Sequence, residues 1–131
     1  MIALDSSALI EVVARQPLAD ECARFISRSE LIISAATLAE ALIVASRKRV
    51  LSELDDVLAA LDLTVEEVDA EFAERAADAY RRWGKGYHPA CLNYGDSFSY
   101  ALAEMYGCPL LYVGNDFAQT DIRNALAGEA G

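Results

Sequence analysis

The chain has little positive charge, a single histidine and few cysteines, and each shortage narrows its possible functions. The chain has 11 Lys and Arg residues but 21 Asp and Glu residues, so its formal net charge is −10. Sequence-independent affinity for nucleic acid comes from basic side chains that neutralise phosphates. The charge balance therefore argues against non-specific binding to nucleic acid.

The cysteine and histidine content excludes several kinds of site. Cys22, Cys91 and Cys108 are an odd number with no C-x-x-C spacing, which argues against a disulfide framework and against a zinc site. His88 is the only histidine, so no mechanism with paired histidines is open to this chain. A Ser-His-Asp triad would have to be built around this one residue, in an apparent loop beside Pro89, and is disfavoured.

Long apolar runs are also missing. No segment approaches the roughly 20 apolar residues of a membrane span, and residues 1–10 are too short, and interrupted too early by Asp5, for a signal peptide. We therefore expect a cytoplasmic protein with no membrane segment. With 54% hydrophobic and 24% charged residues over 131 positions, the sequence predicts one globular domain spanning residues 1–131.

The chain does contain short apolar segments that alternate with segments of helical periodicity. This order predicts an α/β domain with a mainly parallel sheet. The predicted strands cover residues 2–4, 31–33, 63–65 and 110–113. The predicted helices cover residues 6–14, 37–48, 50–61 and 68–83, with one more that opens at Pro17 and another that Asn93 caps.

Four acidic residues stand alone in apolar surroundings. Asp5, Glu40, Asp96 and Asp116 are the only formal charges in residues 1–10, 31–46, 90–102 and 105–120, respectively. A charge buried without a partner costs several kcal/mol, so four such placements indicate a common partner, a divalent metal ion. Taken singly, Asp5 is also explained as a helix cap and Glu40 as an exposed helical residue.

The predicted elements bring these acids toward one place. Asp5 and Asp116 each follow a strand, and open parallel sheets bind ligands beyond the carboxyl ends of their strands. Glu40 and Asp96 lie on helices that can face the same crevice. Ligand sets of oxygen atoms alone suit Mg²⁺ or Mn²⁺, and such ions orient a phosphate, lower the pKa of bound water and stabilise the leaving oxygen. Neighbouring polar groups predicted to hold the carboxylates are Ser6, Ser97 and Asn115.

Four segments in this order resemble the PIN-domain ribonucleases, specifically the VapC toxins of bacterial type II toxin–antitoxin systems. They are Met1-Ile-Ala-Leu-Asp5-Ser-Ser-Ala-Leu9, Thr37-Leu-Ala-Glu40, Leu92-Asn-Tyr-Gly-Asp96-Ser-Phe-Ser-Tyr-Ala-Leu-Ala103 and Gly114-Asn-Asp116-Phe. The resemblance covers essentially the whole chain, which it makes a single PIN domain. It implies a three-layer α/β/α sandwich around a parallel sheet and a Mg²⁺-dependent endoribonuclease that forms homodimers and is inhibited by a VapB antitoxin.

The resemblance also assigns residues. By position, Asp5, Glu40, Asp96 and Asp116 match the acidic metal cluster of the family, and Asp121 is a secondary candidate. Tyr87 departs from the pattern, because similar toxins often carry Arg after Gly-Lys-Gly; a tyrosine here is suited to stack on an unpaired base. The candidate RNA contacts are Arg47, Lys48, Arg81, Arg82, Lys85 and His88, and the alternative for these basic groups is a solvated helix terminus.

Two other functions remain open on the sequence. One is a non-catalytic PIN-like module that works only by binding an antitoxin-type partner. The other is a receiver-like signalling domain, which would need an acidic pair near the first strand and a Lys after the last strand. Asp5-Ser6-Ser7 and Val113-Gly114-Asn115 supply neither feature.

Overall fold

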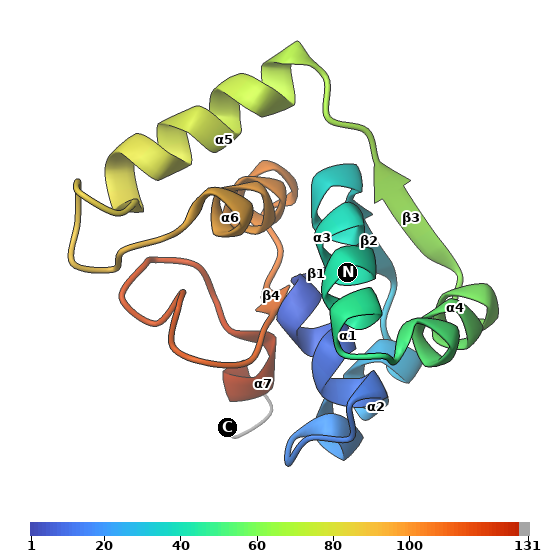
Figure 1. The fold of residues 1–131 in the computed structure, drawn as a ribbon. Coiled ribbons are helices and arrows are strands. Elements are labelled where there is room, and N and C mark those ends of the chain that lie inside the picture. Colours follow the sequence, from blue (N-terminus) through green and yellow to red (C-terminus); the bar gives the residue numbers. More distant parts are fainter. Residues whose placement is uncertain (129–131) are drawn as a thin grey trace.

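Four parallel strands form the centre of the fold (Figure 1), and the computed structural model describes residues 1–128. The strands are β1 (Ile2–Leu4), β2 (Leu31–Ser34), β3 (Leu63–Glu66) and β4 (Leu110–Leu111). The helices are α1 (Ser6–Val13), α2 (Ala19–Arg28), α3 (Ala35–Arg47), α4 (Leu51–Ala60), α5 (Ala70–Trp83), α6 (Tyr94–Tyr106) and α7 (Ala125–Gly128). No helix of this described part is long and apolar enough to cross a membrane.

The strand order is β3-β2-β1-β4, so β1 and β4, which precede Asp5 and Asp116, lie side by side, with β4 at the edge of the sheet. Ala3 of β1 pairs with Ile32 on one side and with Leu110 on the other. Side chains alternate between the two faces of such strands. Ile2 and Leu4 accordingly pack in one hydrophobic cluster, whereas Ala3 packs in the other.

Helices cover both faces of the sheet, which makes a three-layer α/β/α sandwich. One cluster joins the sheet to α1, α2, α3, α4 and α7, and the other joins it to α5 and α6. Figure 1 shows α5 crossing over α6 on its side of the sheet. The prediction of an α/β domain with a parallel sheet is confirmed, since all the strand pairs of the described chain are parallel.

The helices α3 and α2 begin at other residues than predicted. The helix predicted from residue 37 begins at Ala35, since the Ser34 hydroxyl accepts the Thr37 N–H and caps α3. Pro17 does not open α2, which starts at Ala19 after a turn. The Ser34 side-chain cap is of a kind that stabilises a helix by about 1 kcal/mol relative to an alanine at the same place.

The last strand is shorter than predicted, and one short helix was missed. β4 covers only Leu110 and Leu111, after which the Val113 N–H donates to the Ser7 hydroxyl instead of continuing a strand ladder. The chain then makes a long turn-rich loop before α7. The contact with Ser7 holds the start of the loop that carries Asp116 near the end of β1.

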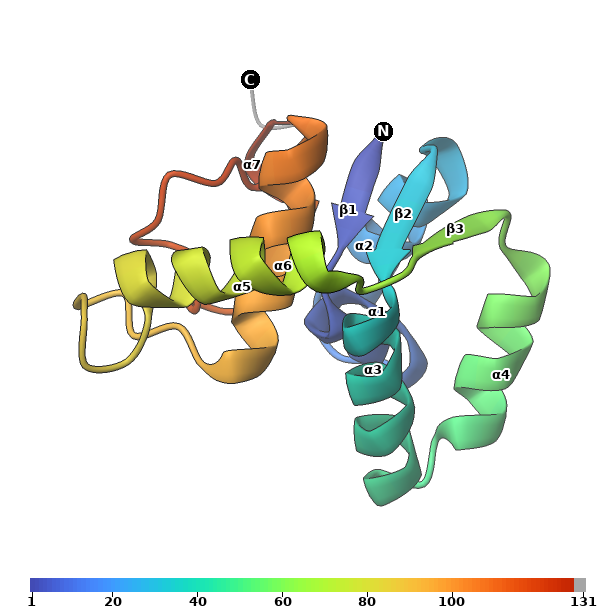
Figure 2. The same cartoon turned by 90° about the horizontal axis from the view of Figure 1, so that it is seen from above.

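The carboxyl edge of the sheet is where the remaining elements converge. In Figure 2, β1 and β2 point the same way, and α1 and α3 begin directly at their ends. The amino-terminal turn of α6 lies on this same side, and α6 packs against α3, β1 and β2. The edge therefore receives side chains from α1, α3 and α6 at once.

Candidate active site

Asp5 stands at the junction of β1 and α1, where the helix-capping role considered in the sequence is confirmed. It caps α1, because its Oδ2 accepts hydrogen bonds from the Ser7 N–H at 3.1 Å and from the Ser7 hydroxyl at 2.6 Å. Its Oδ1 accepts the Ser99 hydroxyl of α6 at 2.6 Å. Only 4% of the residue is exposed. These three donors fix the carboxylate at the carboxyl edge.

Glu40 reaches the same edge from α3. Its Oε1 accepts the Ser6 hydroxyl of α1 at 2.7 Å. Its Oε2 lies against Gly95 of α6, so closely that a Cβ atom at position 95 would be 2.2 Å from it. An alanine at position 95 would force the end of the Glu40 side chain to shift, so this glycine lets the carboxylate lie between α1 and α6.

Asp96 lies in the first turn of α6 and takes part in a capping box with Asn93. The Asn93 side chain accepts the Asp96 N–H at 2.9 Å, and Asp96 Oδ2 accepts the Asn93 N–H at 3.1 Å. The residue is 6% exposed. Within the described chain, no donor contacts its second oxygen, Oδ1.

The surroundings of Asp96 raise the pKa of its carboxyl group. Burial, the largest effect, raises the pKa of Asp96 from 3.8 to about 7, although the hydrogen bond from the Asn93 backbone opposes this change. The charges of Asp5, Asp116 and Glu40 also contribute to this rise. Each of the three lies within electrostatic reach of Asp96, including Asp116, which is exposed on the turn after β4.

These four residues, Asp5, Glu40, Asp96 and Asp116, are called the acidic cluster below. Among residues 1–128, no three His, Cys, Asp or Glu side chains are arranged to hold a metal ion as they stand. The donor set nevertheless fits a hard divalent cation, because it offers only oxygen atoms and concentrates negative charge around a buried carboxyl. A carboxylate oxygen has more than one acceptor position, so the serine donors leave room for a further ligand.

The groups that hold the cluster differ in part from those predicted. Ser6 contacts Glu40 as expected, but the Ser97 hydroxyl donates to the Tyr94 carbonyl and reaches no carboxylate. The expectation for Ser97 was therefore wrong, because its position on α6 turns it toward α5. Asn115 is exposed, and its backbone carbonyl accepts the Ala118 N–H.

Ser7 and Ser99, which sequence reasoning missed, make the contacts expected of Ser97. The Ser7 hydroxyl donates to Asp5 and accepts the Val113 N–H at 3.0 Å, so it ties the ends of β1 and β4 together. Ser99 lies three residues after Asp96, on the same face of α6, and that helical spacing was the available signal.

A series of buried hydroxyl groups leads to Ser99 and supports its hydrogen bond to Asp5. The Ser34 hydroxyl donates to Thr37 at 3.0 Å, and the Thr37 hydroxyl lies 3.3 Å from that of Ser99. Since Ser99 uses its proton on Asp5, Thr37 is the donor in the second contact. Every donor in the series is used, and aligned hydrogen bonds of this kind reinforce one another.

Asp121 lies in a different network from the acidic cluster. Its Oδ1 accepts the Tyr100 hydroxyl, and its Oδ2 accepts Arg82 at 2.9 Å. Arg82 also lies 3.6 Å from Glu104 and over the ring of Trp83. Asp121 and Arg82 thus join the loop after β4 to α5 and α6, which is a structural arrangement.

The other candidate RNA contacts are spread over the surface. Arg81 pairs with Asp78 on α5, while Arg47, Lys48 and Lys85 are exposed. His88 Nδ1 accepts the Ala90 N–H at 2.9 Å, and its ring packs edge-on against Trp83. His88 therefore orders the loop between α5 and α6.

Comparison with known proteins identifies this arrangement. Residues 2–123 match the family described as the PIN domain. The chain belongs to the PIN-domain family. This membership rules out the receiver-like alternative and agrees with the resemblance noted in the sequence.

Its relatives within the family are VapC proteins. Ribonuclease VapC30 of Mycobacterium tuberculosis is 43% identical over 125 residues, which cover 91% of this chain and 94% of that protein. Among solved structures, the sarcin-ricin-loop-cleaving toxin VapC20 of M. tuberculosis superposes with a TM-score of 0.75 at 18% identity, covering 93% of this chain and 96% of that one. VapBC2 from Rickettsia felis, bound to a DNA fragment from its promoter, reaches 0.69 at 13% identity, covering 95% and 96%. At these low sequence identities, the similarity to the two solved structures shows a shared fold.

Proposed function

We propose that this protein is a metal-dependent endoribonuclease and the toxin of a VapB–VapC pair. The observation that carries the proposal is the acidic cluster at the carboxyl edge of a parallel sheet. In it, burial and the charges of Asp5, Asp116 and Glu40 raise the pKa of the Asp96 carboxyl. Such a concentration of negative charge destabilises the fold unless a cation offsets it. Relatives such as ribonuclease VapC30 support RNA as the substrate.

Asp5, Glu40, Asp96 and Asp116 would hold Mg²⁺, with Mn²⁺ as a possible substitute. When bound, such an ion supplies an activated water for phosphodiester hydrolysis and stabilises charge on the leaving oxygen. Asp116 has the room to close on an ion, because it is exposed on its turn.

The chain's own contribution is to orient these carboxylates. Ser7 and Ser99 hold Asp5 from two sides, and Ser6 holds Glu40. The Asn93 N–H orients Asp96 so that only one of its oxygens is used internally. Ligand orientation by such neighbours commonly changes metal affinity or activity by about 10- to 100-fold.

We further infer that a VapB-type antitoxin inhibits the protein and that the toxin acts as a homodimer. The VapC names of the relatives and the VapBC complex among the solved structures support the antitoxin. The acidic cluster also has the charge that a basic antitoxin side chain would neutralise. A copurified antitoxin would therefore protect the cluster and suppress cleavage.

The proposal is tested by incubating purified protein with total RNA in Mg²⁺ buffer and mapping new 5′ ends by sequencing. We expect cleavage by the wild type, loss of cleavage in EDTA, and loss in Asp96→Asn. Asp121→Asn is the matched control, because it removes an acid that lies in another network and should retain cleavage. Cleavage that persists in both EDTA and Asp96→Asn would contradict a metal-dependent site.

The non-catalytic alternative gives a different result. A module that only binds a partner would associate with the antitoxin but leave RNA intact at every Mg²⁺ and Mn²⁺ concentration. The intact set of acids and their serine donors favours catalysis, since binding alone does not require a buried carboxyl with a raised pKa.

A further inference from the structure

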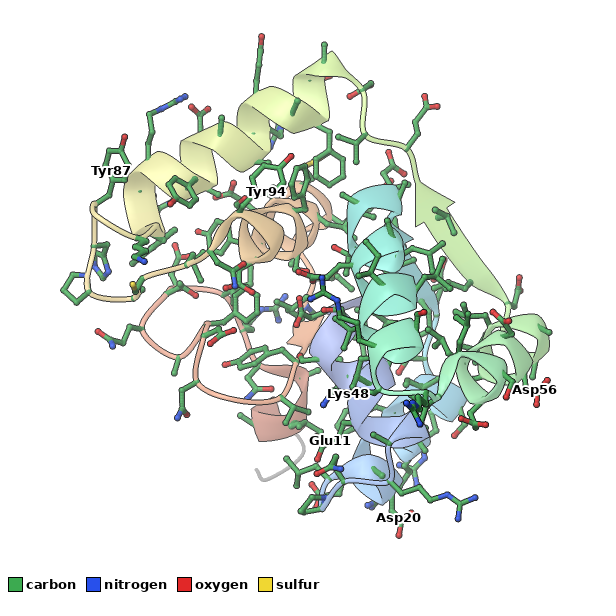
Figure 3. All side chains as sticks on the ribbon, viewed as in Figure 1. Glu11, Asp20, Lys48, Asp56, Tyr87 and Tyr94 are labelled. Carbon is green, nitrogen blue, oxygen red and sulfur yellow. The ribbon has the colours of Figure 1, made fainter. Side chains whose placement is uncertain are left out.

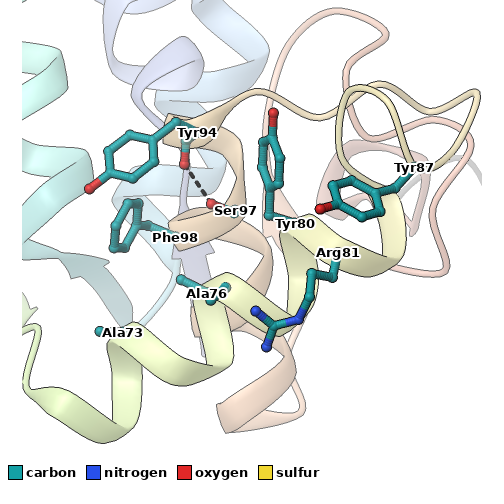
Figure 4. A pocket seen from close by; sticks show the side chains of 9 residues that line it. Ala73, Ala76, Tyr80, Arg81, Tyr87, Tyr94, Ser97 and Phe98 are labelled. Carbon is teal, nitrogen blue, oxygen red and sulfur yellow. Dashed lines mark hydrogen bonds between the residues drawn. The ribbon is translucent and has the colours of Figure 1, made fainter.

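An open groove lies between α5 and α6, and neither the acidic cluster nor the core uses it. Its volume is about 470 Å³, within the roughly 300–1,000 Å³ of ligand pockets. The small residues Ala73, Ala76 and Ala77 of α5 line one side of it, and Figure 4 shows Ala73 and Ala76 there. The lining is completed by Tyr80, Arg81, Tyr87, Tyr94, Ser97 and Phe98. We call this the aromatic groove.

Two aromatic pairs flank the groove. Tyr94 and Phe98 of α6 pack edge to face with ring centres 5.1 Å apart, and Tyr80 of α5 packs in the same way on Tyr87 at 6.0 Å. Figure 4 shows one pair at each side with Ser97 between them. Tyr94 is 75% exposed and Tyr87 is 62% exposed. Two largely exposed tyrosines therefore border an open space.

The groove differs in charge from the rest of the molecule. In a chain with a net charge of −10, its lining contains one cation, Arg81, and no carboxylate. Arg81 pairs with Asp78 outside the lining and stays well exposed. Lys85 follows in the adjoining loop. A flat uncharged group can thus enter without repulsion, while a phosphate attached to it would meet basic side chains at the rim.

The groove and the acidic cluster share the first turn of α6. Tyr94 precedes Gly95, whose backbone lies against Glu40, and Asp96 follows. Figure 3 shows Tyr87 and Tyr94 on the same side of the molecule, beside and beneath α5. A strand of nucleic acid at the acidic cluster therefore passes next to exposed tyrosine rings.

We propose that the aromatic groove binds one unpaired base of the RNA strand, next to the phosphate that is cleaved. Tyr94 and Tyr87 supply the stacking faces, and Arg81 meets the neighbouring phosphate. The proposal rests on the endoribonuclease function proposed above. It explains how this site would select single-stranded RNA. An acidic chain with few cations gains little from phosphate neutralisation, so stacking supplies affinity that charge does not.

The test measures binding without cleavage. Wild-type protein in EDTA is titrated into a fluorescently labelled, mixed-sequence single-stranded RNA, and into an abasic ribose-phosphate strand of the same length. Anisotropy gives the two dissociation constants. We expect the wild type to prefer the strand with bases, and Tyr94→Ala and Tyr87→Ala to bind it roughly fivefold to a hundredfold more weakly. Tyr94→Phe and Tyr87→Phe should bind as the wild type does, since they keep the ring.

Tyr106→Ala is the matched control, because Tyr106 is an exposed tyrosine at the far end of the same helix, outside the groove. Its RNA affinity should not change. Circular dichroism and thermal melting establish that each variant is folded, and truncation of two largely exposed side chains should cost little stability.

Three results would overturn the proposal. Alanine variants that bind RNA as tightly as the wild type would show that the rings do not stack on a base. Equal affinity for the abasic strand would show that only the backbone is bound. Unchanged RNA affinity together with a changed oligomeric state in light scattering would assign the groove to a second copy of the chain. Because binding is measured in EDTA, failure of the cleavage assay alone would count against the proposed function and not against the groove.

Discussion

Replacing Asp96 with asparagine should stabilise the metal-free protein above neutral pH. In the unfolded chain this carboxyl ionises near pH 3.8, whereas in the folded protein its pKa is about 7. Between these values the folded state retains a proton that the unfolded state has lost. The folded state is therefore favoured fully below about pH 4, and this advantage is lost as the pH rises toward 7.

The magnitude follows from the two pKa values. Their difference corresponds to at most about 4 kcal/mol of unfolding free energy, at about 1.4 kcal/mol for each pH unit. Asparagine cannot ionise, but its side-chain oxygen can still accept the Asn93 N–H, so the capping box is kept. Asp96→Asn should then match the wild type near pH 4 and exceed its stability by a few kcal/mol near pH 8.

Urea unfolding in EDTA, followed by circular dichroism across this pH range, measures the difference. Comparing the variant with the wild type at each pH cancels the titration of groups that do not interact with Asp96. Asp56→Asn is the control, since Asp56 points to solvent from α4 (Figure 3) and should give no pH-dependent difference. A stability difference between Asp96→Asn and wild type that stays constant with pH would refute the argument from burial and neighbouring charge.

Two further substitutions test the packing of the site, and a third tests a helix end outside it. Gly95→Ala should greatly slow RNA cleavage without unfolding the protein, because the new Cβ would meet Glu40 Oε2 at 2.2 Å; cleavage rates and urea midpoints separate the two effects. Ser99→Ala should lower the unfolding free energy by about 1–3 kcal/mol, since Asp5 loses a buried donor, and calorimetry measures this. Gly107→Ala should cost about 1–2 kcal/mol in urea unfolding, because φ is +60° at this helix end, and cleavage should persist.

The positions of the acids were predictable because parallel strands align their carboxyl ends. Asp5 and Asp116 follow adjacent strands, so the sheet itself brings them to one edge. Glu40 required one more assumption, the direction in which α3 leaves β2. That direction follows from the Ser34 cap, which begins the helix directly at the strand end.

The partners of these acids were harder to predict, because they depend on helical phase and on loop paths. Ser97 and Ser99 are two residues apart on α6, so one faces α5 and the other faces Asp5. Asp121 is five residues beyond Asp116, but the loop turns it toward Arg82 and Tyr100. The aromatic groove exists only because α5 crosses α6, an angle that no local pattern encodes.

The most direct test of the shared cation site is a calorimetric titration of Mn²⁺ into the wild type and into single variants. Asp5→Asn, Glu40→Gln, Asp96→Asn and Asp116→Asn should each weaken binding by tenfold or more, while Asp121→Asn should bind as the wild type does. Four acidic-cluster variants with wild-type Mn²⁺ affinity would contradict the account.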